Sequence, residues 1–314
     1  MDKKEHILIV GENTVAGLAL RDELMTLGYT GLIRKAENDV DWSVASQTQD
    51  FFSKHRPEYV FLLAGKSGGI DMNTKQPATL MADNILISAN VIMASHKFNV
   101  KKLLYLASSC CYPRECPQPM KPEYLMTGLL EPTNEAYATA KLAGVKMCQA
   151  YRRQYGCNYI TVIPSNPFGP GDKFDAANSH VIEALILKMH NAKIQKKTTV
   201  DIWGTGKARR DFIYSKDLAS ACICSMKEWD DPAPINAGCN TSISIATLAE
   251  TIRDITGFNG DLVFDAGKPD GTPTKILDSS QLHQLGWKSC WSLKEGLTAT
   301  YEWYKERAES ISRI

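Results

Sequence analysis

His6-Ile-Leu-Ile-Val-Gly-Glu-Asn-Thr-Val-Ala-Gly17 is the stretch that decides the fold. Its apolar run predicts a short buried strand, and the residues after Gly17 predict a helix that ends near Gly28. A strand, a glycine turn and a helix open the dinucleotide-binding βαβ unit, in which the helix N-terminus offers backbone N–H groups to a pyrophosphate. The stretch therefore predicts a nucleotide-binding α/β fold.

The turn departs from the usual glycine pattern at one position. Gly11 suits the tight turn, and Gly17 lets the helix pack closely on the strand. Thr14 stands where a middle glycine is expected, so the backbone approaches a phosphate less closely. Its hydroxyl could itself bond a phosphate.

A second strand is expected at Thr30–Ile33, and two cations follow it, Arg34 and Lys35. An acidic residue at this place would bond the ribose 2′-hydroxyl of NAD, whereas cations suit the 2′-phosphate of NADPH. The pair therefore favours NADP(H). The alternative is that both residues are solvated turn charges.

Strands and helices alternate through the first half of the chain. Strands are expected at Tyr59–Leu63, Leu103–Ala107 and Tyr159–Ile163, and helices at Leu80–Phe98 and Tyr137–Tyr155. This alternation predicts a doubly wound parallel sheet, in which ligands sit beyond the carboxyl ends of the strands. The expected strand ends bring together Gly11, Arg34, Ala64, Ser108 and Pro164.

The character of the chain changes after Pro170, where loops rich in Gly, Asp and Asn begin. We expect residues 1–170 to form the nucleotide-binding domain, with a segment at about 211–240 returning to its sheet. Residues 171–210 and 241–314 are expected to form a smaller lobe, with a helix at about Ser179–Ala192.

Tyr137 and Lys141 are spaced to share one face of a helix. An ammonium beside a phenol favours the phenolate, so the pKa of Tyr137 is expected to fall toward working pH. Such a phenol can exchange a proton with an alcohol or carbonyl oxygen, which the hydroxyl of Ser108 could hold. The alternative is a surface tyrosine and a solvated lysine at chance spacing.

The composition excludes several classes of protein. The chain has 314 residues, 44% of them hydrophobic and 23% charged, with a formal net charge of +1. These values predict a globular protein that binds neither nucleic acid nor a membrane surface. No apolar run is expected to be long enough to span a membrane, and no signal peptide is expected. The nine cysteines lack metal-ligand spacing, so reduced thiols in the cytoplasm and no metal site are expected.

Five motifs give the chain a resemblance to a known family. They are Ala107-Ser-Ser-Cys-Cys-Tyr-Pro113, Leu130-Glu-Pro-Thr-Asn-Glu-Ala-Tyr-Ala-Thr-Ala-Lys141, Asn178-Ser-His-Val-Ile182, Trp203-Gly-Thr-Gly206 with Arg210-Asp-Phe, and Lys268-Pro-Asp-Gly-Thr-Pro273. Across nearly its whole length the chain resembles the extended short-chain dehydrogenase/reductases. Within them it is similar to the epimerase-reductases that act on GDP-4-keto-6-deoxy sugars.

The resemblance implies a Rossmann-type sheet with a C-terminal substrate-binding lobe, and roles for individual residues. Ser108, Tyr137 and Lys141 would form the reductase triad, and Cys110 and His180 the acid and base of epimerisation. The implied substrate-binding positions are Ser109, Lys188, Trp203, Arg210 and Asp270. The implied cofactor-binding positions are Gly11, Thr14, Val15, Gly17, Arg34, Lys35, Ala64, Leu106, Ala107, Tyr137, Lys141, Pro164, Asn166, Pro167 and His180.

The implied activity is the NADPH-dependent conversion of GDP-4-keto-6-deoxy-D-mannose to GDP-L-fucose, in a homodimer. Lys188 stands where the family usually has arginine, and the loop at Ala64-Gly65-Lys66-Ser67 also differs from the usual sequence. A related GDP-4-keto sugar, such as a 6-deoxy-heptose or a 3,6-dideoxy sugar, therefore stays open as the substrate. A nucleotide-sugar 4-epimerase or dehydratase is the further alternative. Ser109-Cys110 argues against a dehydratase, which needs an Asp-Glu pair there.

Overall fold

The computed structural model describes residues 1–33, 40–175 and 179–311. Its centre is a parallel sheet with the strand order β1-β2-β3-β4-β9. The strands are β1 (Ile7–Val10), β2 (Tyr59–Leu62), β3 (Lys102–Leu106), β4 (Tyr159–Pro164) and β9 (Ile235–Ala237). Every neighbouring pair in the sheet is parallel, as the alternation of strands and helices predicted.

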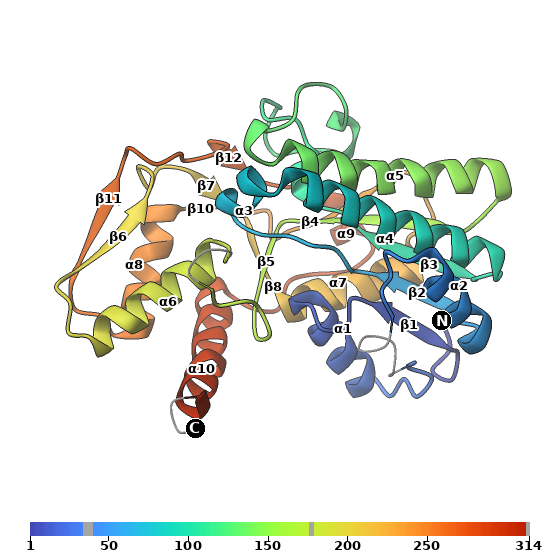
Figure 1. The fold of residues 1–314 in the computed structure, drawn as a ribbon, viewed down its shortest axis with the longest axis horizontal. Coiled ribbons are helices and arrows are strands. Elements are labelled where there is room, and N and C mark those ends of the chain that lie inside the picture. The colour runs from blue at the N-terminus through green and yellow to red at the C-terminus, as the bar shows by residue number, and fades with distance from the viewer. Residues whose placement is uncertain (34–39, 176–178, 312–314) are drawn as a thin grey trace.

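Helices cover both faces of this sheet (Figure 1). On one face lie α1 (Val15–Thr26) and α7 (Ser215–Glu228), and their apolar side chains share a buried cluster with the strands. On the other face lie α2 (Ala45–His55), α4 (Pro77–Lys97) and α5 (Glu135–Tyr155), which supply Phe52, Val91 and Val145 to a second cluster. The short α3 (Ile70–Lys75) precedes α4. The core is therefore the doubly wound one that was expected.

The strand expected at Thr30–Ile33 is reduced to a single bridge in the described residues. Leu32 pairs in parallel with Ile7, and the N–H of Ile33 donates to the carbonyl of Ile7 over 2.9 Å. Gly31 passes so close to the carbonyl oxygen of Glu5 that no side chain would fit there. The segment thus lies beside β1 as predicted, but the prediction of a continuous strand over 30–33 was wrong.

A second lobe is built from later segments and lies at the left in Figure 1. It contains α6 (Val181–Ile194), α8 (Ile245–Thr256) and α10 (Leu293–Ile311), packed with the parallel pair β6 (Thr199–Trp203) and β11 (Asp261–Asp265). A small sheet joins β10 (Ile243–Ser244), β7 (Arg209–Arg210) and β12 (Thr274–Lys275). The remaining elements are β5 (Asn166–Phe168), β8 (Phe212–Tyr214), α9 (Ser280–Gln284) and the 3₁₀ turns η1 (Ser109–Cys111), η2 (Pro122–Tyr124) and η3 (Pro132–Asn134).

Helix α4 is long and apolar enough to cross a membrane when judged by length and composition alone. The expectation that no apolar run is long enough to span a membrane therefore overlooked helix α4. The helix packs beside α5 and α2 on the central sheet, and 39% of its most apolar window is buried. Its apolar character is that of a helix covering a sheet in a folded core.

Candidate active site

Ser108 and Cys110 follow the carboxyl end of β3, where the chain turns into η1. The hydroxyl oxygen of Ser108 accepts from the N–H of Cys110 over 3.2 Å and so caps this turn. Ser109 is buried behind it. The turn holds Ser108 and Cys110 at the sheet edge where a doubly wound fold binds its ligands.

Tyr137 and Lys141 lie one turn apart on α5, as predicted. The Lys141 ammonium is buried and donates to the carbonyl oxygens of Leu106, over 3.1 Å, and Ala64, over 3.5 Å. It therefore ties α5 to the carboxyl ends of two neighbouring strands. Burial lowers the pKa of Lys141 to about 8.

The expected lowering of the Tyr137 pKa was wrong for this structure. Burial of the phenol raises its pKa, the Cys110 sulfur adds to the rise, and a hydrogen bond with Ser108 opposes it. Desolvation disfavours the phenolate more than its polar neighbours favour it. The phenol of Tyr137 therefore favours its protonated form.

Two side chains that the sequence reasoning missed converge on Cys110. Asn134 donates from Nδ2 to the Cys110 sulfur over 3.3 Å, and Lys275 donates from Nζ over 3.6 Å. Asn134 stands one helical turn before Tyr137, a spacing that could have suggested a shared site. Lys275 follows the Lys268–Pro273 motif directly, but no spacing rule links it to Cys110.

His180 is the N-cap residue of α6, in the second lobe. The residue as a whole is exposed, yet desolvation by the surrounding protein lowers the pKa of its imidazole, while the charge of Asp172 acts in the opposite direction. A Cβ on Gly69 would lie 2.9 Å from the carbonyl oxygen of Ser179, and one on Gly65 would lie 3.2 Å from Lys141 Nζ. The glycine loop after β2 thus touches both Lys141 and the residue before His180.

The nucleotide-binding turn is built as predicted, except for the role of Thr14. Gly11 has a φ of 98°, and a Cβ there would lie 2.5 Å from the backbone nitrogen of Ala64. Gly17 packs against Gly11 too closely for any side chain. The Thr14 hydroxyl donates to the Gly11 carbonyl over 2.7 Å and accepts from Gly17 N–H over 3.0 Å, so it caps α1. The Thr14 hydroxyl therefore stabilises the turn itself, and its contact with a phosphate stays a prediction.

The other predicted cofactor positions fall along the same sheet edge. Val15 begins α1, Leu106 ends β3 and Ala107 follows it. Pro164 ends β4, and Asn166 and Pro167 lie in β5. Arg34 and Lys35 lie outside the described residues.

Apart from Ser109, which lies in η1, the predicted substrate-binding residues form two groups in the second lobe. Trp203 is 49% exposed, and the ammonium groups of Lys188 and Lys268 lie 5.8 Å and 5.2 Å from the centre of its ring. Arg210 donates to the carbonyl oxygen of Asp270 over 3.2 Å, while the Asp270 carboxylate accepts from Thr205. The arrangement combines an aromatic face with cations, which suits a nucleotide with its phosphates.

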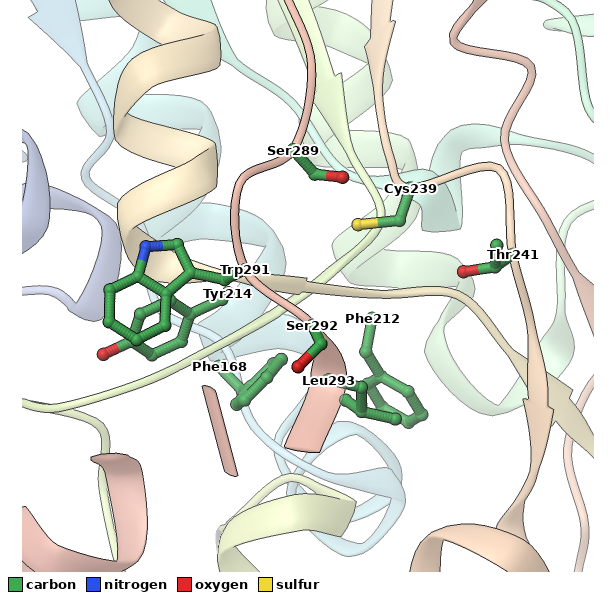
Figure 2. A pocket seen from close by; sticks show the side chains of 9 residues that line it. All are labelled: Phe168, Phe212, Tyr214, Cys239, Thr241, Ser289, Trp291, Ser292 and Leu293. Atoms are coloured by element: carbon green, nitrogen blue, oxygen red, sulfur yellow. The ribbon is translucent and has the colours of Figure 1, made fainter. Parts of the chain in front are cut away.

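A pocket lined by other residues is shown in Figure 2. Aromatic rings form one side of it, and the thiol of Cys239 and several hydroxyl groups face them. It is lined by Phe168, Phe212, Tyr214, Cys239, Thr241, Ser289, Trp291, Ser292 and Leu293. Its lining includes none of the residues that the sequence assigned to the site. Within the described parts of the chain, no cluster of His, Cys, Asp or Glu could hold a metal ion.

Comparison with known proteins relates the chain to nucleotide-sugar enzymes. It is 43% identical over 303 residues to GDP-L-fucose synthase 1 of Arabidopsis thaliana, covering 96% of this chain and 94% of that one. It is 42% identical over 315 residues to GDP-L-fucose synthase of Escherichia coli (strain K12), covering 98% of each chain. The solved GDP-mannoheptose C4 reductase of Campylobacter jejuni with NADP bound is 37% identical, with a TM-score of 0.88 and coverage of 97% and 99%.

A family model matches residues 7–238, from β1 through the returning strand β9. The match therefore includes the nucleotide-binding turn, the Ser108–Lys141 stretch and His180. Together with relatives that are more than 40% identical over nearly the full length, it establishes the family. The chain belongs to the NAD dependent epimerase/dehydratase family.

Proposed function

We propose that the protein converts GDP-4-keto-6-deoxy-D-mannose to GDP-L-fucose by epimerisation at C3 and C5 and reduction at C4, using NADPH. The observation that carries the proposal is the position of Cys110. Its sulfur lies near the Tyr137 phenol and Ser108, at the end of β3, and accepts hydrogen bonds from two side chains. A reductase site alone requires Ser108, Tyr137 and Lys141 but no thiol beside them.

Epimerisation requires proton transfer at carbons next to a ketone. Hydrogens at C3 and C5 are acidic because the electron pair left behind spreads onto the C4 oxygen. A thiol and an imidazole, the groups that Cys110 and His180 carry, are side-chain groups that can exchange protons near neutral pH. We assign them as the base and acid that act on the two faces of the sugar, and Tyr137 with Ser108 as the groups that stabilise the negative C4 oxygen.

Reduction uses the same phenol a second time. Because burial raises its pKa, Tyr137 holds its proton and can give it to O4 as the ketone becomes an alcohol. Lys141 fixes the position of α5 against Leu106 and Ala64 and so places Tyr137. NADPH, when bound, supplies the hydride for C4.

The turn after β1 fits a dinucleotide. Gly11 and Gly17 allow the backbone of the turn to pack too closely for any side chain, and α1 begins within the turn at Val15, so its N-terminus can face a phosphate. Val15, Leu106, Ala107, Pro164, Asn166 and Pro167 would line the remainder of this site. The NADP held by the Campylobacter jejuni reductase supports the choice of NADP(H).

The GDP part of the substrate would lie on the second lobe. Trp203 offers a face for a base, and Lys188 and Arg210 offer positive charge to a diphosphate. We accordingly propose that residues 1–170 and about 211–240 bind the cofactor, and that residues 171–210 and 241–314 bind the substrate.

The test is a direct assay with the purified protein. Incubation with GDP-4-keto-6-deoxy-D-mannose should oxidise NADPH and yield GDP-L-fucose, identified by product NMR. Run in deuterated water, the product should carry deuterium at C3 and C5. Cys110→Ser should reduce this incorporation by at least about a hundredfold while leaving the fold intact. Absence of turnover with any 4-keto nucleotide sugar would contradict the proposal.

A related sugar is the second candidate. The likeness to a GDP-mannoheptose C4 reductase favours a 6-deoxy-heptose, and a 3,6-dideoxy sugar is a further candidate of the same type. The same NMR assay with a panel of GDP-4-keto sugars decides between them. The substrate with the highest kcat/KM is the one that the second lobe selects.

We also propose that the protein is a homodimer that works in a reducing compartment, the cytoplasm. All nine cysteines are unpaired in the structure. Helix α4 exposes Leu86 and Met93, which are 46% and 51% accessible and lie on one face. Such a stripe beside α5 suits contact with a second copy of the chain.

A further inference from the structure

Lys275 and Cys110 meet although they are 165 positions apart in the sequence. Lys275 ends β12 in the small sheet of the second lobe, and Cys110 lies in η1 beside the central sheet. The ammonium nitrogen is 3.6 Å from the sulfur, within hydrogen-bond range for a thiol or thiolate acceptor. Both side chains are half-buried, so water screens the contact only in part.

The placement of Lys275 beside another cation needs an explanation. Strand β12 runs parallel to β7 with Lys275 in register with Arg210, and like charges directly across a pair of strands are unfavourable. The Arg210 guanidinium donates to the carbonyl oxygens of Arg209 and Asp270. Among the described residues, no carboxylate lies within salt-bridge distance of Lys275. The group that meets its ammonium is the sulfur of Cys110.

A second donor approaches the same sulfur from another element. Asn134, at the end of η3, donates its amide to Cys110 over 3.3 Å. A thiol buried only for packing requires no such donors. Donors from η3 and β12 fix where the sulfur lies and favour its negatively charged form, because hydrogen bonds to an ionised acceptor are the stronger ones.

We propose that Lys275 is a positioning residue for epimerisation, which holds the sulfur of Cys110 and stabilises its thiolate. This inference rests on the proposed function. In the step concerned, the thiolate takes a proton from the carbon beside the ketone, so that the C–H bond breaks and an S–H bond forms. The electron pair moves onto the C4 oxygen, and Lys275 neither gives nor takes a proton in this step.

A test must separate the effect of Lys275 on Cys110 from the effects of the other charged and titratable groups that face this thiol. The groups that face it are Tyr137 from α5, Cys111 next in the chain, Arg210 from β7 and Lys275 from β12. Among these four groups, Lys275 is the one that combines a positive charge with a hydrogen bond to the sulfur in the described residues. Substituting Lys275 therefore changes the stability of the Cys110 thiolate with the least change elsewhere in the site.

The first measurement is the alkylation rate of Cys110 by iodoacetamide in the free enzyme, followed by peptide mass spectrometry. Lys275→Met should slow it by at least about tenfold, since only the thiolate reacts. Lys275→Arg, which keeps the charge, should restore most of the rate. Lys268→Met removes a cation that contacts Trp203, so it should leave the rate unchanged. An unchanged rate in Lys275→Met would overturn the proposal.

The second measurement separates the two half-reactions. Lys275→Met should lower kcat for deuterium incorporation at C3 and C5 by at least about tenfold. Oxidation of GDP-L-fucose by NADP⁺, which needs no epimerisation, should fall much less. If the variant only raises KM for both reactions, Lys275 binds the diphosphate and the proposal is wrong. If the wild-type enzyme turns over neither sugar, the proposed function fails, while the alkylation rates still decide whether Lys275 controls Cys110.

Discussion

Lys141 donates a hydrogen bond of 3.1 Å to the carbonyl oxygen of Leu106, the last residue of β3. This bond fixes α5 against β3, the strand that leads to Ser108. Tyr137 on α5 and Ser108 after β3 are therefore held close together. The ammonium is buried at 4% exposure, and burial lowers its pKa to about 8. In this structure the lysine places the phenol, whereas burial is the main cause that raises the pKa of Tyr137, with smaller effects from Cys110 and Ser108.

Tyr137→Phe should abolish hydride transfer, because the ring stays while the proton donor to O4 is removed. We expect NADPH oxidation to fall by at least about a hundredfold, the usual contribution of a positioned acid. Tyr155→Phe is the matched control, since Tyr155 lies on the same helix but is 50% exposed. If Tyr137→Phe kept more than a tenth of the wild-type rate, another group would have to protonate O4.

Tyr112→Phe should destabilise the protein without touching the chemistry. The buried Tyr112 hydroxyl donates to Asn236 Oδ1 over 2.6 Å, and Asn236 Nδ2 donates to the carbonyl oxygens of Met120 and Asp278. Removing the hydroxyl leaves a buried acceptor without its donor, which costs about 1–3 kcal/mol of the free energy of unfolding.

Urea denaturation of Tyr112→Phe measures this loss. The control is a double-mutant cycle with Asn236→Leu, in which the Tyr112 substitution should cost much less because its acceptor is gone. Equal costs in both backgrounds would show that the hydrogen bond contributes nothing. NADPH oxidation should remain within about twofold of wild type at a temperature where both proteins are folded.

The elements of the first half were predictable because each has a local signal. The run before Gly11 has the length and apolar character of a buried strand, and a turn with two glycines admits few alternatives. The Tyr137–Lys141 spacing likewise fixes a shared helix face. The sequence therefore predicted the parallel sheet and the edge at which the site lies.

What could not be predicted depends on contacts between distant segments. Nothing in the local sequence says that Lys275 reaches Cys110, since their meeting depends on how the second lobe folds onto the sheet. The Tyr137 pKa was predicted in the wrong direction because spacing reveals a neighbouring charge but not the degree of burial. The role of Thr14 as a helix cap was not predicted, because it depends on the geometry of the turn.

Leu86→Lys combined with Met93→Lys should convert the expected dimer to a monomer. The two side chains are seven residues apart on α4, about two helical turns, and are exposed in the single chain. Charges there would have to be desolvated in an interface. Light scattering gives the mass of each protein. Leu27→Lys, at a 39% exposed apolar position beyond α1, is the control that should leave the dimer intact. A monomeric wild type would refute the prediction.

Asp211 should make the stability of the protein depend on pH. It is 1% exposed, its Oδ1 accepts from the N–H of Cys239 over 3.2 Å, and among the described residues its Oδ2 has no hydrogen-bond partner. Burial raises the pKa of Asp211 to about 7. The unfolded chain has an ordinary aspartate with a pKa near 4, so the folded state binds its proton more tightly.

The sign of the effect follows from linkage. Below pH 4 the Asp211 carboxyl is protonated in both the folded and the unfolded state, and its contribution to the free energy of unfolding is fully present. That contribution is lost as pH rises through about 7. The difference amounts to about 4 kcal/mol of unfolding free energy. Asp211→Asn cannot ionise, so the variant should gain stability relative to wild type between pH 5 and 8. Urea midpoints of the two proteins at both pH values measure the gain, and a difference that stays constant with pH would show that Asp211 titrates normally in the folded protein.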